Sequence, residues 1–263
     1  MSPTFRVLFK LATLVLPVSA FAQEPPQSST RWSIGAGTSV TASPYAGEET
    51  RIRPIPLIGY EGQRFFLRGA SGGVHLYNSD QFTFDAILSA RLDGFDASDL
   101  GRAELRANGV NRDLLSDRDD GIDAGVRATY RTAYGDIALE ALHDISDASD
   151  GYEVSLDYRY TWHISRATLT ANAGASWMSS RLAGYYFGTL DEEVSRGVTE
   201  YSPGSAVTPH IGMTLMQPIG STKWALLGAV EYRHLQSELR DSPLLESDRN
   251  GIAQLVIGLS RRF

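Results

Sequence analysis

Strict alternation of apolar and polar residues is the dominant pattern of this sequence. It is clearest at residues 152–162, where Tyr, Val, Leu and Trp side chains occupy one face and charged or hydroxyl side chains occupy the other. Successive side chains of a β-strand point to opposite faces, whereas a helix would mix the two classes on every face. The segment therefore predicts a strand, with a length of about 10 residues that matches a tilted membrane-crossing strand.

The same pattern recurs along the chain, with short turns alternating with long polar loops such as 93–120 and 188–202. Gln63–Asn78, which contains a turn at 69–73, is interpreted as a short hairpin. Outer-membrane barrels have this arrangement, with the short turns in the periplasm. We predict an all-β, transmembrane, antiparallel up-and-down barrel of about twelve strands, with both termini periplasmic; ten strands is the alternative. Besides the hairpin, the expected strands are 32–43, 51–60, 81–92, 121–133, 136–144, 150–161, 166–178, 204–217, 221–235 and 252–263.

Two prolines fall within the second expected strand. Pro54 and Pro56 carry no N–H group and cannot donate to a ladder of backbone hydrogen bonds. We therefore expect the strand at 51–60 to be interrupted or bulged at these residues.

The first 22 residues predict a cleaved export signal. A basic start precedes a short apolar stretch that ends in Ala20-Phe21-Ala22, which fits an A-x-A cleavage site after Ala22. The stretch is shorter than the about 20 apolar residues of a membrane helix. Residues 23–30 have nothing to bury and are expected to form a flexible periplasmic lead-in. Residues 31–263 are expected to form the barrel.

The composition limits which cellular compartment and which classes of partner are possible. The chain has 24 basic and 31 acidic residues, a formal charge of −7, and it loses Arg6 and Lys10 with the signal. This acidic balance argues against a nucleic-acid partner. There is no cysteine, so neither disulfides nor a thiolate nucleophile is available. No apolar run beyond the signal is long enough for a membrane helix, and a closed barrel is the other fold that satisfies every backbone group in lipid.

The chain end favours a membrane barrel over a soluble periplasmic β-sandwich or barrel. Leu255, Ile257 and Leu259 alternate before the terminal Phe263, although Arg261 departs from the alternation. These four apolar residues are expected to act as the outer-membrane assembly signal. Tyr and Trp residues also gather near strand ends, as interfacial girdles require. We therefore expect the outer membrane of a Gram-negative bacterium, with its lipid and lipopolysaccharide, as the protein's surroundings.

The polar strand faces should point inward, and their charges are mixed in sign. Charges in a partly dehydrated lumen are costly unless they are paired, and a barrel of this size encloses limited space. We predict a lumen crossed by Arg–carboxylate pairs and closed to large solutes; the selectivity lining of a small passive channel is the alternative. The predicted network consists of Asp85, Arg91, Asp123, Arg127, Arg131, Asp136, Glu140, Glu153, Asp157, Arg159, Glu231, Arg233 and Arg262.

The sequence carries no recognisable catalytic or metal-binding motif. None of the five histidines sits in a known motif, and no G-x-S-x-G elbow is present. The acidic loops lack the spacing of an EF-hand. We therefore predict no catalytic residues, no cofactor and no metal site. A lipid-modifying enzyme would require a serine and a histidine adjacent on the lipid-facing or outer-rim surface.

Several short motifs resemble landmarks of the MipA/OmpV family of outer-membrane proteins. Ser43-Pro44-Tyr45-Ala46-Gly47 and Arg53-Pro54-Ile55-Pro56-Leu57 are similar to its N-terminal signature. Tyr185-Tyr186-Phe187-Gly188 and Asp241-Ser242-Pro243-Leu244 resemble later landmarks, in the expected order. The resemblance implies an outer-membrane barrel and, for the MipA branch, a scaffold that binds a murein-cleaving lytic transglycosylase and joins it to a murein synthase. Other members are associated with adhesion to host surfaces or with antibiotic response.

The functional hypothesis is accordingly a non-enzymatic scaffold for a murein (peptidoglycan) hydrolase and synthase. Contacts are expected through the periplasmic turns and residues 23–30. A small passive channel is the alternative, and a lipid-modifying enzyme is less favoured than either.

The mature chain is expected to begin at Gln23. Mass spectrometry of the protein purified from outer membranes should return that N-terminus. Replacing Ala22 with Arg should leave the precursor uncut, because the cleavage site requires small residues. A purified wild-type chain that still begins at Met1 would contradict the prediction.

Overall fold

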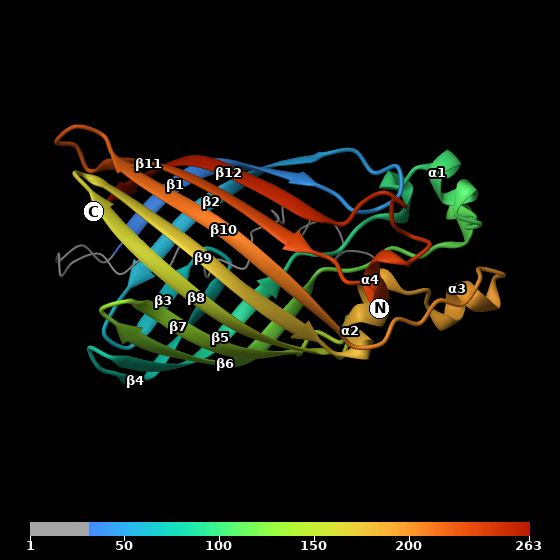
Figure 1. Cartoon of the computed structure of the whole chain (residues 1–263), viewed down its shortest axis with the longest axis horizontal. Coiled ribbons are helices and arrows are strands. Elements are labelled where there is room, and N and C mark those ends of the chain that lie inside the picture. The colour runs from blue at the N-terminus through green and yellow to red at the C-terminus, as the bar shows by residue number, and fades with distance from the viewer. Residues whose placement is uncertain (1–31) are drawn as a thin grey trace, which may run out of the picture.

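The computed structural model describes residues 32–263, in which twelve antiparallel strands close into a barrel (Figure 1). The predicted signal peptide, its cleavage site and the lead-in at 23–30 lie outside the described residues. Each strand pairs with its neighbours in sequence, and the first strand pairs with the last. The twelve-strand prediction is confirmed, including the hairpin within 63–78. The strands are β1 (Trp32–Ala42), β2 (Arg51–Glu61), β3 (Phe65–Arg68), β4 (Ser71–Asn78), β5 (Phe82–Arg91), β6 (Gly121–Thr132), β7 (Gly135–Asp144), β8 (Tyr152–Ile164), β9 (Ala167–Met178), β10 (Ala206–Pro218), β11 (Trp224–His234) and β12 (Gly251–Arg262).

The two ends of the barrel differ in the length of their connections. The N–H of Phe263 donates to the carbonyl of Trp32 at 3.1 Å, so the first and last strands meet at the end that carries the short turns. Short turns mark the periplasmic end of such barrels. The long loops gather at the other end, on the right of Figure 1, and contain α1 (Arg102–Ala107), α2 (Ser180–Phe187), α3 (Asp191–Ser195) and α4 (Ser237–Arg240). Among residues 32–263 no helix is long and apolar enough to cross a membrane.

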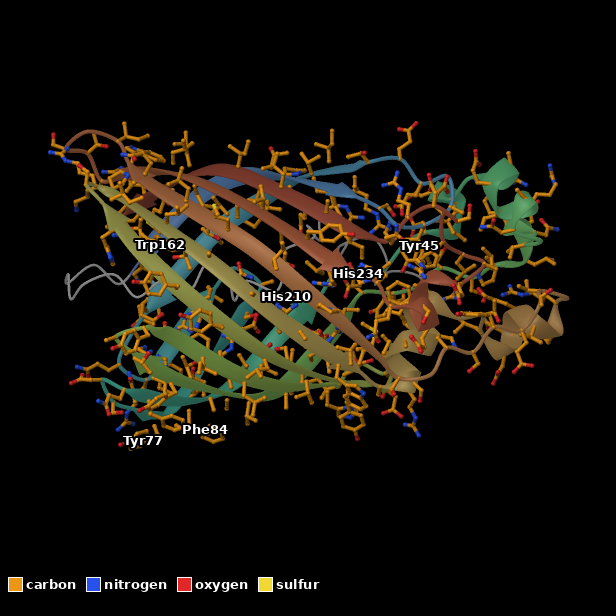
Figure 2. All side chains as sticks on the ribbon, in the orientation of Figure 1. Tyr45, Tyr77, Phe84, Trp162, His210 and His234 are labelled. Carbon is orange, nitrogen blue, oxygen red and sulfur yellow. The ribbon has the colours of Figure 1, made fainter. Side chains whose placement is uncertain are left out.

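The outer surface of the barrel carries the apolar half of each alternating strand. Large apolar side chains are exposed along β8 and β12, including Leu255, Ile257 and Leu259 of the expected assembly signal, and the terminal Phe263 is exposed too. Figure 2 shows Trp162 toward the periplasmic end of the barrel. Trp32 and Tyr60 pack their rings there at 4.7 Å between centroids. Lipid contact explains this exposure, because in water it would be a large unfavourable apolar area.

The expected interruption at Pro54 and Pro56 is wrong. β2 runs unbroken through both prolines, in continuous register with β1. The N–H of Gly69, the residue after β3, donates to the carbonyl of Ile58, so the backbone groups of Ile58 point away from β1. Backbone groups alternate in direction along a strand, so those of the other even-numbered residues of β2 also point away from β1. β3 pairs with β2 only from Gly59 to Glu61. The two prolines therefore face an edge with no strand partner, where the missing N–H costs no ladder bond.

The long outer loops form a hydrophobic core of their own. They were expected to be polar stretches. Instead, five of their leucines are almost completely buried in one hydrophobic cluster: Leu100, Leu105, Leu182, Leu239 and Leu244. The core is built from the loops after β1, β5, β9 and β11, which are distant in sequence. We call this assembly the cap; it comprises residues 43–50, 92–120, 179–205 and 235–250.

The proline account predicts how β2 responds to substitution. Pro54→Ala and Pro56→Ala should change the free energy of unfolding by less than about 1 kcal/mol, because no ladder bond is gained or lost. Arg53→Pro should lower the free energy of unfolding by at least about 2 kcal/mol. The N–H of Arg53 faces β1, and its loss would leave a backbone carbonyl of β1 without a hydrogen-bond donor. Urea unfolding in lipid vesicles measures both, with Arg53→Ala as the control for the side chain. Equal losses at positions 53 and 54 would disprove the assignment of edges.

Candidate functional site: the charged lumen and the outer cap

Arg91 is the centre of a charged cluster in the outer half of the lumen. It ends β5, and its guanidinium lies 2.8 Å from Asp123 of β6 and 2.7 Å from Glu153 of β8. A third carboxylate, Asp93, lies 3.5 Å from the same group. The arginine and the first two carboxylates are largely buried, so their pairing offsets the cost of removing them from water.

Two further Arg–carboxylate pairs lie along the lumen. Arg127 of β6 stands opposite Glu140 in the β6–β7 register and donates from Nε to its Oε2 at 2.5 Å. Glu231 and Arg233 share the inward face of β11, two residues apart, with 3.5 Å between their charged atoms.

Two other carboxylates of the predicted network pair with histidines. Asp157 lies 2.8 Å from Nε2 of His210, and Asp85 lies 2.6 Å from Nδ1 of His75. The second ring nitrogen of His75 lies 3.1 Å from Glu61. Sequence reasoning did not identify these partners. Asp157 and His210 lie on strands that are not adjacent in the barrel, and a register shift of β4 against β5 directly after His75 interrupts the alternation there.

The remaining residues of the predicted network lie toward the periplasmic end. Arg159 stands opposite Asp136 in the β7–β8 register. Arg131 donates to a backbone carbonyl of the β4–β5 turn at 3.3 Å, and Arg262 contacts a methionine sulfur of β10 at 2.9 Å. The structure thus places Arg131 and Arg262 away from the cluster around Arg91.

A cavity of about 820 Å³ lies within this network. Six carboxylates and three arginines line it, together with His210. The lining is therefore net acidic, and an anion in this cavity would meet net repulsion. Arg91, Asp93, Glu153 and Arg233 also line a second cavity nearer the cap.

The loops of the cap are held together by close backbone contacts. The N–H of Gly101 donates to Ala46 at 2.9 Å, and the N–H of Ala46 donates to Leu244 at 2.9 Å. A Cβ on Gly47, whose φ is 66°, would lie 2.5 Å from the Cα of Gly101. Only glycine fits this approach and this backbone conformation, so the loop after β1 seats tightly against the loop after β5.

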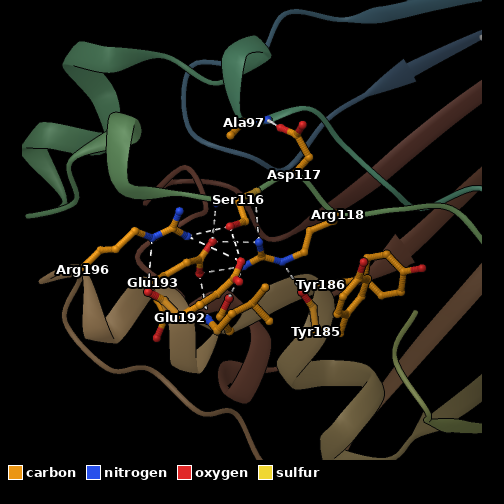
Figure 3. A network of polar contacts seen from close by, with 12 residues as sticks. Ala97, Ser116, Asp117, Arg118, Tyr185, Tyr186, Glu192, Glu193 and Arg196 are labelled. Carbon is orange, nitrogen blue, oxygen red and sulfur yellow. Dashed lines mark hydrogen bonds and ion pairs between the residues drawn. The ribbon is translucent and has the colours of Figure 1, made fainter. Parts of the chain in front are cut away.

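A buried ion pair joins the two longest loops of the cap (Figure 3). Arg118 donates from Nη1 and Nη2 to the two oxygens of Glu193, at 2.8 and 2.9 Å, and neither side chain is exposed. The guanidinium also donates to the carbonyls of Tyr185, Ser116 and Gly188. Every charged atom of the pair is therefore used, which is the condition under which such a pair is tolerated in a dry site.

Glu193 has a second role at the start of α3. Its carboxylate accepts from the backbone N–H of Leu190 at 2.7 Å and from that of Ser116 at 2.8 Å. A glutamate at this position commonly satisfies the free N–H groups at a helix start. One side chain therefore both caps α3 and holds the loop after β5.

Tyr45 links three loops of the cap. Its hydroxyl donates to the carbonyl of Tyr186 at 3.0 Å, and its ring packs on Phe95 with 4.4 Å between centroids. Burial raises the pKa of Tyr45, so the hydroxyl keeps its proton and remains a donor. The resemblance motifs at 43–47 and 185–188 thus meet in space.

A scan against protein-family models matches residues 34–263 to the family "MltA-interacting protein MipA". The chain belongs to the MipA family. The MltA-interacting protein of Escherichia coli K12 is 28% identical over 236 residues, which cover 89% of this chain and 90% of that protein. The putative outer membrane protein YiaT of the same strain is 30% identical over 254 residues, covering 96% and 97%.

One further relative and one solved barrel also match the chain. Outer membrane protein OmpV of Vibrio cholerae is 26% identical and covers 79% of this chain and 92% of its own. The solved NanC porin matches with a TM-score of 0.47 and 10% identity, over 88% of this chain and all of that one. Family membership and homologous outer-membrane proteins place this MipA-family chain in the outer membrane of Gram-negative bacteria.

Three of the five histidines of this MipA-family barrel make polar contacts. His75 and His210 contact carboxylates, and His143 contacts the backbone carbonyl of Gly151. In the described part of the chain, no group of three or more His, Asp or Glu side chains is arranged to hold a metal ion.

The cap pair has a defined pH dependence. Burial raises the pKa of the Glu193 carboxyl, but hydrogen bonds from Arg118 and from two backbone N–H groups outweigh it and hold the pKa below its usual range. A lowered folded pKa contributes stability above the ordinary carboxyl pKa, and this contribution is lost as the pH falls through the lowered value. The cap is therefore fully stabilised at neutral pH.

Glu193→Gln should loosen the cap and leave the barrel folded. The substitution leaves the Arg118 charge buried without a counter-charge, which costs about 3–5 kcal/mol. Tryptic cleavage within residues 102–118 should accelerate by at least about a hundredfold, while the heat-dependent gel shift of the barrel stays unchanged.

Asp113→Asn provides the matched control, since Asp113 pairs with Arg102 on the exposed surface of the same loop. An exposed pair contributes little, so its cleavage rate should remain that of the wild type. Equal cleavage of the two variants would contradict the role assigned to the buried pair.

Proposed function

We propose that this MipA-family barrel is a non-catalytic scaffold. It holds a murein-cleaving lytic transglycosylase at the periplasmic face of the outer membrane and joins it to a murein synthase. The observation that carries the proposal is similarity over nearly the whole chain to a protein named for its interaction with MltA.

The packing and ion pairs at the outer end favour a scaffold over a passive channel. Cap residues from four loops pack over the outer end, and Arg91 bridges carboxylates from two other strands across the lumen beneath it. Solute passage would require breaking contacts whose groups are buried and paired. A protein that acts through its periplasmic surface needs no such opening.

The periplasmic turns offer a surface of fixed shape. Arg166, in the turn after β8, donates to the carbonyl of Gly220 in the turn after β10 at 2.7 Å. Lys223 lies in that second turn, so the two cations belong to one linked patch. Tyr134, at the tip of the turn after β6, is 81% exposed. Exposed aromatic and cationic side chains on a rigid frame are typical anchors for a protein partner.

A pull-down from envelope extract tests the proposal. The tagged mature protein in mild detergent is expected to retain a lytic transglycosylase and a murein synthase, identified by mass spectrometry. The double variant Arg166→Glu, Lys223→Glu should retain less than about a tenth as much, because it reverses the charge of the linked patch.

Arg102→Glu with Arg106→Glu, on the exposed face of α1 at the outer end, makes the same charge change and should retain the full amount. If neither wild type nor this control retains a murein hydrolase or synthase, the scaffold proposal fails. Equal loss in both double variants would remove the patch from it.

A further inference from the structure

A second cavity, of about 700 Å³, lies between the cap and the charged lumen. Tyr45, Met178, Leu182, Tyr186 and Phe187 contribute apolar and aromatic surface to its wall. Charged side chains of the upper lumen line its other side. An apolar and aromatic wall that faces charged and hydroxyl groups is typical of a small-molecule site.

The charges that line this cavity favour an anion. Three arginines, at positions 51, 91 and 233, face two carboxylates, Asp93 and Glu153. The balance is therefore opposite in sign to that of the deeper cavity. By the charges of its lining, this cavity is the one of the two that would accept an organic anion.

Of the three arginines that line this cavity, Arg233 has N–H donors available for a ligand. Arg51 donates to Glu48 at 2.8 Å and to a cap carbonyl, and Arg91 is held by its carboxylates. Within residues 32–263, the recorded ion pair of Arg233 is the 3.5 Å contact with Glu231, longer than a hydrogen bond. A guanidinium has five N–H donors in a fixed fork, so Arg233 has donors to present to the cavity.

Thr41 supplies an independent observation. It lines the same cavity from β1, is only 7% exposed, and its Oγ1 is buried without a hydrogen-bond partner among the described residues. Buried hydroxyl groups are normally satisfied. β1 and β11 both pair with β12, so Thr41 and Arg233 stand on the same side of the cavity.

We propose that this cavity binds a small amphiphilic organic anion. The acidic group contacts Arg233, the Thr41 hydroxyl provides a further polar contact, and the apolar or aromatic body lies against Tyr45, Tyr186 and Phe187. The site is separate from the periplasmic surface of the scaffold proposal and stands or falls independently of it.

Isothermal titration of the mature wild-type protein in non-ionic detergent tests the site. The probe is 4-phenylbutyrate, compared with 4-phenylbutylamine and 4-phenylbutan-1-ol, which share its apolar body. We expect saturable binding of one 4-phenylbutyrate per chain. The amine and the alcohol should bind at least about tenfold more weakly, because they lose the charge-assisted hydrogen bond.

Variants assign the binding to Arg233. Arg233→Gln should raise the Kd for 4-phenylbutyrate by at least about tenfold, and Arg233→Lys, which keeps the charge, by no more than about threefold. Arg262→Gln removes a lumen arginine that lines neither cavity and should leave the Kd unchanged. Absence of saturable binding to the wild type, equal affinity for the amine, or equal Kd in the Arg233→Gln and Arg262→Gln variants would overturn the proposal.

Photolabelling keeps the test independent of whether Arg233→Gln folds. A diazirine derivative of 4-phenylbutyrate on the wild-type barrel should label peptides that contain Tyr45, Tyr186 or Phe187, and excess 4-phenylbutyrate should suppress the label. Labelling confined to the lipid-facing surface or the periplasmic turns would refute the site.

Discussion

Pairing of β1 with β12 is the constraint on which the rest of this structure depends. A membrane interior offers no water to backbone N–H and C=O groups, so a sheet that crosses it must close on itself. Closure directs one face of every strand to lipid and the other into the lumen, where charged groups lose most of their water. The clusters around Arg91, Arg127 and the two lumen histidines follow, because inward charges must find partners.

The cap extends the same logic to the outer end. Its four loops bury apolar side chains together, and the pair of Arg118 and Glu193 joins the two longest of them with every charged atom hydrogen-bonded. Beneath it lie two spaces of opposite electrostatic character, divided by groups that include Arg91 and Glu153. An outer end closed by the cap would leave the periplasmic turns as the surface through which the proposed scaffold meets its partners, and a ligand under the cap would be a separate property of the barrel.

Strand positions and inward charges could be predicted because the alternation has a period of two and every strand repeats it. Which charges pair could not be predicted, because partners such as Asp157 and His210 come from strands that are not adjacent in the barrel. The prolines of β2 were misjudged because a strand's sequence does not say which of its edges is unpaired. The cap was missed because Leu100 and Leu105 stand among charged residues, and only tertiary contacts distinguish such leucines from those of a solvated loop.

The central claim is that this barrel is closed, by the cap and by paired charges in the lumen. Single-channel recording in planar lipid bilayers tests it most directly. The account predicts that the mature wild-type protein, at neutral pH, gives no large stable conductance steps. Large stable steps would contradict the account.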